Sequence, residues 1–162
     1  MSIRKLAVEP HPVLRAKAKP IRRFTADLKR LARDLIDTMY ANDGIGIAAP
    51  QVGVNARLFI ANPSQKRGSE IAVVNPEIEE AEGSIVFTEG CLSVPNIWGK
   101  VERPSQVVVR AYDLFGKPMT IEASGLLAVV LQHEIDHLDG KLFIDRLPSR
   151  RKSNAARARI PS

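Results

Sequence analysis

The chain has 162 residues, 44% hydrophobic and 26% charged, which predicts one globular domain and excludes disordered, collagen-like and disulfide-rich classes. Its longest fully apolar run, 126–131, is far too short to cross a membrane, and the first twenty residues lack an apolar signal segment. The net charge of +6 belongs almost entirely to residues 149–162, which carry +5, so it does not indicate a domain that binds specific DNA.

A helix is the first predicted element, with Thr25 as its N-cap and a stop near residues 42–44. Asp27 lies in its first turn, where a negative charge is favourable. Its apolar residues recur at helical spacing and are Leu28, Leu31, Ala32, Leu35, Ile36 and Met39. The glycine-rich segment GIGIAAPQVG (44–53) follows and is too irregular for a helix.

Short strands dominate the middle of the chain, and a second helix follows them. The strands are predicted at 57–61, 71–75, 84–88, 106–112 and 119–122. The helix runs from an N-cap at Ser124 to about Leu138, with Gly140 as a left-handed stop. Because GLLAVVL (125–131) is apolar on every face, this helix should be inserted into the core. We therefore predict an α+β fold of mostly antiparallel sheets wrapped around one buried central helix, with an N-terminal helix.

The central helix carries the motif HEIDH (133–137). Residues four apart lie one turn above each other, so His133 and His137 can place two imidazoles on one metal ion. Glu134 points away by about 100°, where a carboxylate can exchange a proton without being a ligand. The alternative is a chance pattern with two ordinary hydrogen-bonded histidines. Burial favours a metal, because unsatisfied polar groups cost about 1 to 3 kcal/mol each in an apolar core.

A third ligand is required, and Cys91 in EGCLSVP is the best candidate. No histidine follows His137, and Asp139 and Asp145 lie too near the helix end to fold back easily. His11 is the only other histidine, and we expect it to be a surface or packing residue. The alternative for Cys91 is a small buried hydrophobe. A lone cysteine persists most easily in a reducing compartment, so we expect the protein in a cytoplasm.

Three segments together resemble the signature motifs of bacterial peptide deformylases. They are GIGIAAPQ (44–51), EGCLS (89–93) and QHEIDH (132–137), and their order and separation are also similar to the family pattern. Similarity continues from HPVLR near the amino terminus to GKLFIDRL. The resemblance implies one catalytic domain over 1–148, and the five basic residues beyond it form a basic tail over 149–162. We expect the protein in a bacterial cytoplasm.

The resemblance implies a metal-dependent hydrolase that removes the N-formyl group from the initiator methionine of nascent polypeptides and releases formate. Cys91, His133 and His137 would bind one divalent metal ion, ferrous iron in the cell, with zinc, nickel or cobalt able to replace it. A water activated by the metal would attack the formyl carbon, and Glu134 would be the general base. The Gln51 side chain and the Leu92 amide would stabilise the charge on the formyl oxygen.

The same resemblance places the substrate beside the first two motifs. The glycines let the backbone approach an extended peptide and pair with it as an added strand would, although a plain turn remains the alternative for Gly44. The expected substrate-binding residues are Ile45, Gly46, Phe87, Glu89, Gly90, Val129 and Val130. The apolar members could equally be ordinary core. Trp98 stands about where some members carry a peptide-binding arginine, and it either stacks on substrate or covers the rim of the site.

Two other functions stay open from the sequence. One is an endopeptidase that uses the same helix motif, which Cys91 as third ligand does not fit. The other is a degenerate relative that only binds peptides or the ribosome, against which the complete set of site residues argues. The basic tail suggests the ribosome surface as a partner, and its alternative is a solvated run of charge.

Overall fold

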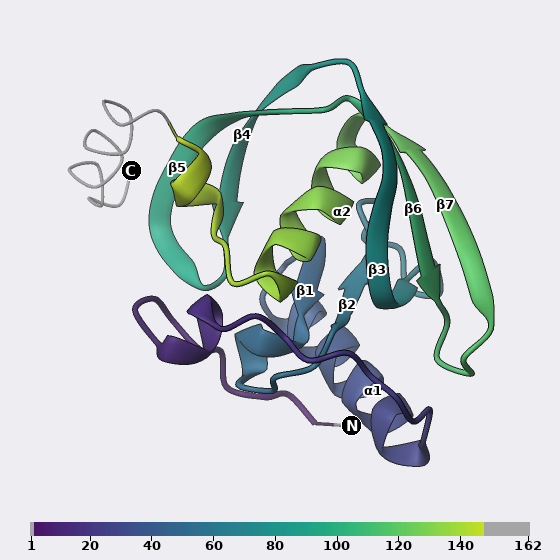
Figure 1. The fold of residues 1–162 in the computed structure, drawn as a ribbon. Helices are drawn as coiled ribbons and strands as arrows, with labels where there is room; N and C mark the ends of the chain where they lie inside the picture. The colour runs from purple at the N-terminus through teal and green to yellow at the C-terminus, as the bar shows by residue number, and fades with distance from the viewer. Residues whose placement is uncertain (1, 148–162) are drawn as a thin grey trace.

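Helix α2 (Gly125–Leu138) lies at the centre of the computed structural model, which describes residues 2–147 (Figure 1). Strands β4 (Ile85–Cys91) and β5 (Val94–Arg103) form a hairpin on one side of it. A five-stranded sheet in the order β1-β2-β3-β6-β7 packs against the helix from the other side and from below. Every strand pair is antiparallel, and the predicted α+β class is confirmed.

The strands of the larger sheet match the predicted ones, with two differences. They are β1 (Gly46–Ala48), β2 (Leu58–Ala61), β3 (Ile71–Glu82), β6 (Gln106–Tyr112) and β7 (Pro118–Ser124). Strand β3 continues seven residues beyond the predicted end, because pairing with β6 extends it through an exposed acidic stretch that has no apolar alternation. Strand β1 was not predicted, since its three residues pair only with β2 at the sheet edge.

Helix α1 (Ala26–Ala41) forms as predicted. The Thr25 hydroxyl accepts a hydrogen bond from the Leu28 amide at 3.3 Å, which caps the first turn. Its apolar face packs on β1 and β2 in a second core cluster. The described residues also contain three short 3-10 helices, η1 (Pro12–Arg15), η2 (Ala49–Val52) and η3 (Phe143–Arg146), which were not predicted.

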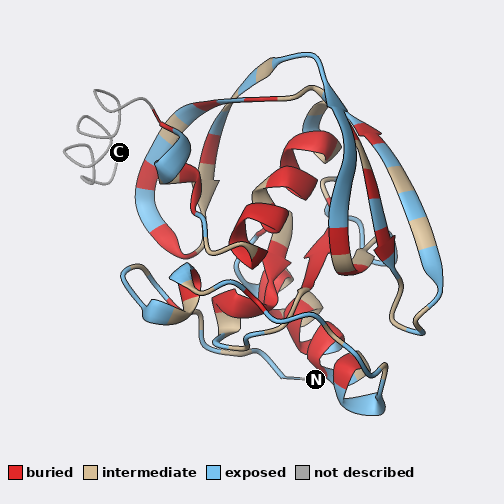
Figure 2. Ribbon diagram, viewed as in Figure 1, coloured by how far each residue is buried: buried red, intermediate tan, exposed pale blue. Residues whose placement is uncertain are grey.

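Helix α2 enters the core only after its first turn. Leu126 is 38% exposed, whereas residues 128–138 are buried except for His133, whose side chain is 12% exposed (Figure 2). The expectation of burial along the whole apolar run was therefore wrong at the start, where the helix leaves the sheet at β7. Ser124 is the N-cap, but its side chain makes no capping hydrogen bond. Among the described residues, neither α1 nor α2 is both long and apolar enough to span a membrane.

Gly140 ends the central helix as predicted. Its φ of +76° lies in the left-handed region, and a Cβ there would come within 2.5 Å of the Arg15 carbonyl oxygen. This close approach joins the end of α2 to η1. Strand β5 was missed, because Pro95, Gly99 and alternating charges conceal its apolar positions. The predicted tail, 149–162, lies outside the described residues.

Candidate active site

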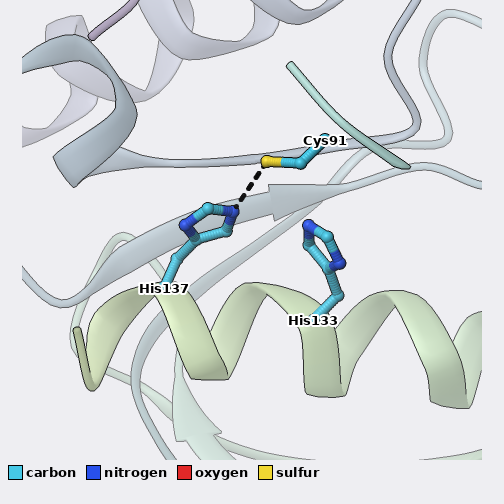
Figure 3. A group of neighbouring side chains, drawn as sticks. All are labelled: Cys91, His133 and His137. Carbon is cyan, nitrogen blue, oxygen red and sulfur yellow. Dashed lines mark hydrogen bonds between the residues drawn. The ribbon is translucent and has the colours of Figure 1, made fainter. Parts of the chain in front are cut away.

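Cys91, His133 and His137 meet where the end of β4 passes over α2 (Figure 3). One ligand atom from each side chain lies within 4.8 Å of the other two. The Cys91 sulfur is 3.2 Å from Nε2 of His137, and the two imidazoles are one turn apart on the same helix face. The three predicted ligands are therefore brought to one point by two elements that are distant in sequence.

These residues fit a divalent metal. A thiolate and two imidazoles suit zinc and iron, and three protein ligands leave one coordination position open. The buried Oε1 of Glu134 and Nδ1 of His137 have no hydrogen-bond partner among the described residues. Unpartnered buried polar atoms are costly, so Oε1 of Glu134 is expected to meet water or substrate in the site. In His137 it is Nε2, the nitrogen that faces the Cys91 sulfur, that is available to a metal.

Glu134 lies beside the three ligands and against β1. A Cβ added to Gly46 would come within 2.5 Å of the Glu134 Oε2 atom, so the glycine leaves the space that the carboxylate occupies. Burial raises the pKa of Glu134 to about 7, because the opposing charges of His133 and His137 only partly offset desolvation. A carboxylate with a pKa near neutrality can both accept and return a proton.

Cys91 is held as a thiolate. Burial by itself raises the pKa of the thiol, but the imidazoles of His137 and His133 outweigh it and lower the pKa to about 5. The sulfur also accepts hydrogen bonds from the Ser93 amide at 3.4 Å and from Nε2 of Gln51 at 3.7 Å. A stabilised thiolate is the form that binds a metal.

The Gln51 amide is oriented by both of its ends. Its Oε1 accepts from the Ala48 amide at 2.9 Å, and its Nε2 donates to the Ser93 hydroxyl at 3.2 Å. Because the backbone donor identifies the oxygen, the NH2 group must face Cys91. The side chain is buried, so it presents fixed donors to the site.

Glu89 was predicted to contact substrate, and in the structure its carboxylate contacts His133, a predicted ligand. Oε1 lies 2.9 Å from Nδ1 of His133, and Arg103 donates to both carboxylate oxygens at 2.6 and 2.9 Å. Although burial opposes it, these donors lower the pKa of Glu89. The ionised carboxylate therefore accepts the Nδ1 hydrogen, which leaves Nε2 of His133 free to bind a metal.

A cavity of about 510 Å³ opens onto Cys91 and His133, two of the three predicted ligands. Its lining includes every predicted site residue except His137. Trp98 forms part of the rim: it is 64% exposed, and its indole ring lies so close to Gly90 that a Cβ there would meet a ring carbon at 2.3 Å. The cavity thus combines an apolar wall, formed in part by Phe87, Val129 and Val130, with the polar groups that converge on Cys91.

The sequence did not indicate the buried charges behind the ligands. Arg103 is almost fully buried and joins Glu89 to Asp136, which in turn pairs with Arg146. Arg103 lies on the strand that was missed, so no periodicity marked it as an inward residue. Asp136 gave the only available signal, as a second acidic residue in a helix whose first half is apolar.

The family model for polypeptide deformylase matches residues 3–153. The chain belongs to the polypeptide deformylase family. It is 51% identical over 147 residues to a peptide deformylase of Caldicellulosiruptor bescii, covering 91% of this chain and 87% of the relative. A crystal structure of a Legionella pneumophila peptide deformylase superposes with a TM-score of 0.93 at 46% identity, covering 98% and 94% of the two chains.

A Synechococcus elongatus peptide deformylase, solved in complex with actinonin, is also similar. Its TM-score is 0.89 at 39% identity, with 98% of this chain and 86% of that chain covered. The protein is accordingly a metal-dependent enzyme that removes the formyl group from nascent chains. The alternatives of an endopeptidase and of a degenerate binding module are not favoured.

The lowered pKa of Cys91 is directly measurable in metal-free protein. We expect its ultraviolet thiolate absorbance to titrate with a midpoint near pH 5, so that the thiolate persists at neutral pH. A Cys91→Ser variant provides the baseline without a thiol. A midpoint near the ordinary thiol value of about 8.5 would show that the two imidazoles do not stabilise the thiolate.

Proposed function

We propose that deformylation takes place at a metal held by Cys91, His133 and His137, with Glu134 as the general base. The observation that carries this proposal is the convergence of the three ligand atoms beside a buried carboxylate at the cavity. When bound, a divalent cation supplies positive charge that polarises a carbonyl oxygen and lowers the pKa of water. The protein's own residues then have to position the formyl group, move protons and exclude bulk solvent.

Glu134 is suited to the proton transfers. Its Oε1 atom has no partner among the described residues and burial raises its pKa, so the carboxylate can accept a proton from the attacking water and return it to the departing amine. Its carboxylate is held against Gly46 and therefore cannot swing away in that direction. We assign to Gln51 and to the Leu92 amide the donors that stabilise negative charge on the formyl oxygen. The oriented NH2 group of Gln51 and the position of Leu92 in the cavity lining support this.

The methionine side chain of the substrate would occupy the apolar part of the cavity. Phe87 on β4 and Val129 and Val130 on α2 line it from two sides. The backbone of Ile45, Gly46 and Gly90 would bind the peptide chain in extended form, since β1 is an edge strand with one side unpaired in the described sheets. We assign Glu89 to this set through its place in the lining.

We propose ferrous iron as the metal in the cell, with zinc, nickel or cobalt able to replace it. The mixed sulfur and nitrogen donors support a transition metal over magnesium or calcium. Metal analysis of protein purified without oxygen should find about one iron per chain, and a chain filled with zinc under those conditions would contradict the assignment.

We also propose that residues 1–148 form the catalytic domain and that residues 149–162 act as a basic tail in a bacterial cytoplasm. The substrate emerges from a ribosome, whose surface is dense with RNA phosphate, and five positive charges in this segment favour association with it. The domain itself carries only +1, so the tail is the segment suited to this contact.

Replacement of Glu134 by glutamine tests the general base. The amide is nearly isosteric but cannot accept the proton, so we expect formate release from formyl-Met-Ala-Ser to fall at least about 100-fold with the metal retained. Glu122→Gln makes the same change at an exposed position on β7. It is the control and should leave turnover unchanged. Near-normal deformylation by metal-loaded Glu134→Gln would remove this residue from the mechanism.

Removal of residues 150–162 tests the tail. Turnover of the formyl tripeptide should be intact, whereas co-sedimentation with ribosomes should weaken, and binding by the full chain should fall steeply with salt. A full-length chain with its five basic tail residues replaced by serine separates charge from length. Equal ribosome binding by all three proteins at low salt would leave the tail as solvated charge.

A further inference from the structure

The two histidine ligands differ in how they are supported. Nδ1 of His133 is held by the Glu89 carboxylate, whereas Nδ1 of His137 has no hydrogen-bond partner among the described residues. A ligand whose second nitrogen is anchored has a defined ring orientation and tautomer. The geometry of His133 therefore depends on whatever holds Glu89 in place.

A chain of ion pairs connects Glu89 to the surface. Arg103 binds both oxygens of Glu89 and also donates to Oδ2 of Asp136 at 3.0 Å. Arg146 then binds both oxygens of Asp136, at 2.5 and 2.7 Å. The side chains of Arg103, Glu89 and Asp136 are at most 9% exposed, whereas that of Arg146 is 42% exposed. This series of ion pairs thus begins at the surface with Arg146 and ends at Glu89, which contacts His133.

Charge balance makes each member depend on the next. Two guanidinium groups face two carboxylates, so the charges of these four side chains balance as long as Arg146 is present. Without Arg146, Arg103 would have to serve both carboxylates, and an uncompensated negative charge would remain in a poorly solvated position. Arg103 would then be drawn toward Asp136, which loosens its paired hydrogen bonds to Glu89.

The 3-10 helix η3 contacts His133 by a second route. Its first residue, Phe143, stacks on the His133 ring with the centroids 6.2 Å apart and the planes at 22°. Phe143 is buried, so this contact restrains the ring from its face while Glu89 restrains it from its edge. Phe143 and Arg146, the first residues of the two routes, belong to the same four-residue helix.

We infer that η3 is a positioning element for the metal site, in which Arg146 acts through Asp136, Arg103 and Glu89 to hold His133. This inference rests on the proposed role of His133 as a ligand. Arg146 and Asp136 do not line the cavity. Their effect should therefore appear mainly in how tightly the metal is held and only weakly, through Glu89, in how the substrate binds.

The test measures metal release from zinc-loaded holoenzyme into excess chromophoric chelator. We expect Arg146→Ala to release zinc about 10-fold faster than the unaltered chain, the lower end of the effect usual for residues behind a ligand. Arg146→Lys keeps the charge but not the paired hydrogen bonds, and it should be intermediate. The KM for formyl-Met-Ala-Ser, at saturating zinc, should stay within about twofold in both variants.

Arg15→Ala is the matched control, because Arg15 pairs with Asp145 of the same 3-10 helix and is not part of the network. It should leave zinc release unchanged even where it lowers the unfolding temperature. Unchanged release in Arg146→Ala, or equal acceleration in Arg15→Ala, would overturn the inference. If Arg146→Ala does not fold, the release rate of Arg146→Lys decides. A holoenzyme that never retains zinc would instead overturn the metal site itself.

Discussion

The fold is organised around the ionisable side chains that one helix carries into the core. Glu134, Asp136 and His137 are buried on α2 and the His133 side chain is only 12% exposed, so each would be costly without a partner. Asp136 is satisfied by two arginines and His133 by Glu89. Oε1 of Glu134, one of the two buried atoms left without a partner among the described residues, belongs to the carboxylate beside the converging ligands. The cost of burying Glu134 is thus placed where a reacting group would relieve it.

This constraint explains features in distant parts of the chain. Gly46 on β1 has no side chain because the Glu134 carboxylate occupies that space. The end of β4 brings Glu89 and Cys91, two residues apart, onto the two sides of the same histidine pair. Arg103 is buried on β5 because Glu89 and Asp136 both need its charge. The hairpin and the helix are therefore joined by electrostatic pairs as well as by apolar contacts.

The sequence was informative where local patterns and chemistry coincide. Helical spacing and a threonine cap predicted α1, and HEIDH with Cys91 predicted a ligand set that the fold brings within 4.8 Å. It was uninformative where tertiary pairing decides the outcome. The exposed half of β3 and all of β5 form because their partners hold them, and Arg103 carried no signal of burial. The prediction for Gly46 was also incomplete, because it did not include the contact with Glu134, which follows only from the folded geometry.

X-ray absorption spectroscopy of the zinc-loaded protein tests the central claim most directly, because it identifies the atoms bound to the metal. The account predicts one sulfur at about 2.3 Å and two imidazole nitrogens at about 2.0 to 2.1 Å, with the sulfur lost in Cys91→Ser. A spectrum of the unaltered chain that contains no sulfur scatterer, or that shows only one imidazole, would contradict the assignment of Cys91, His133 and His137 as the ligands.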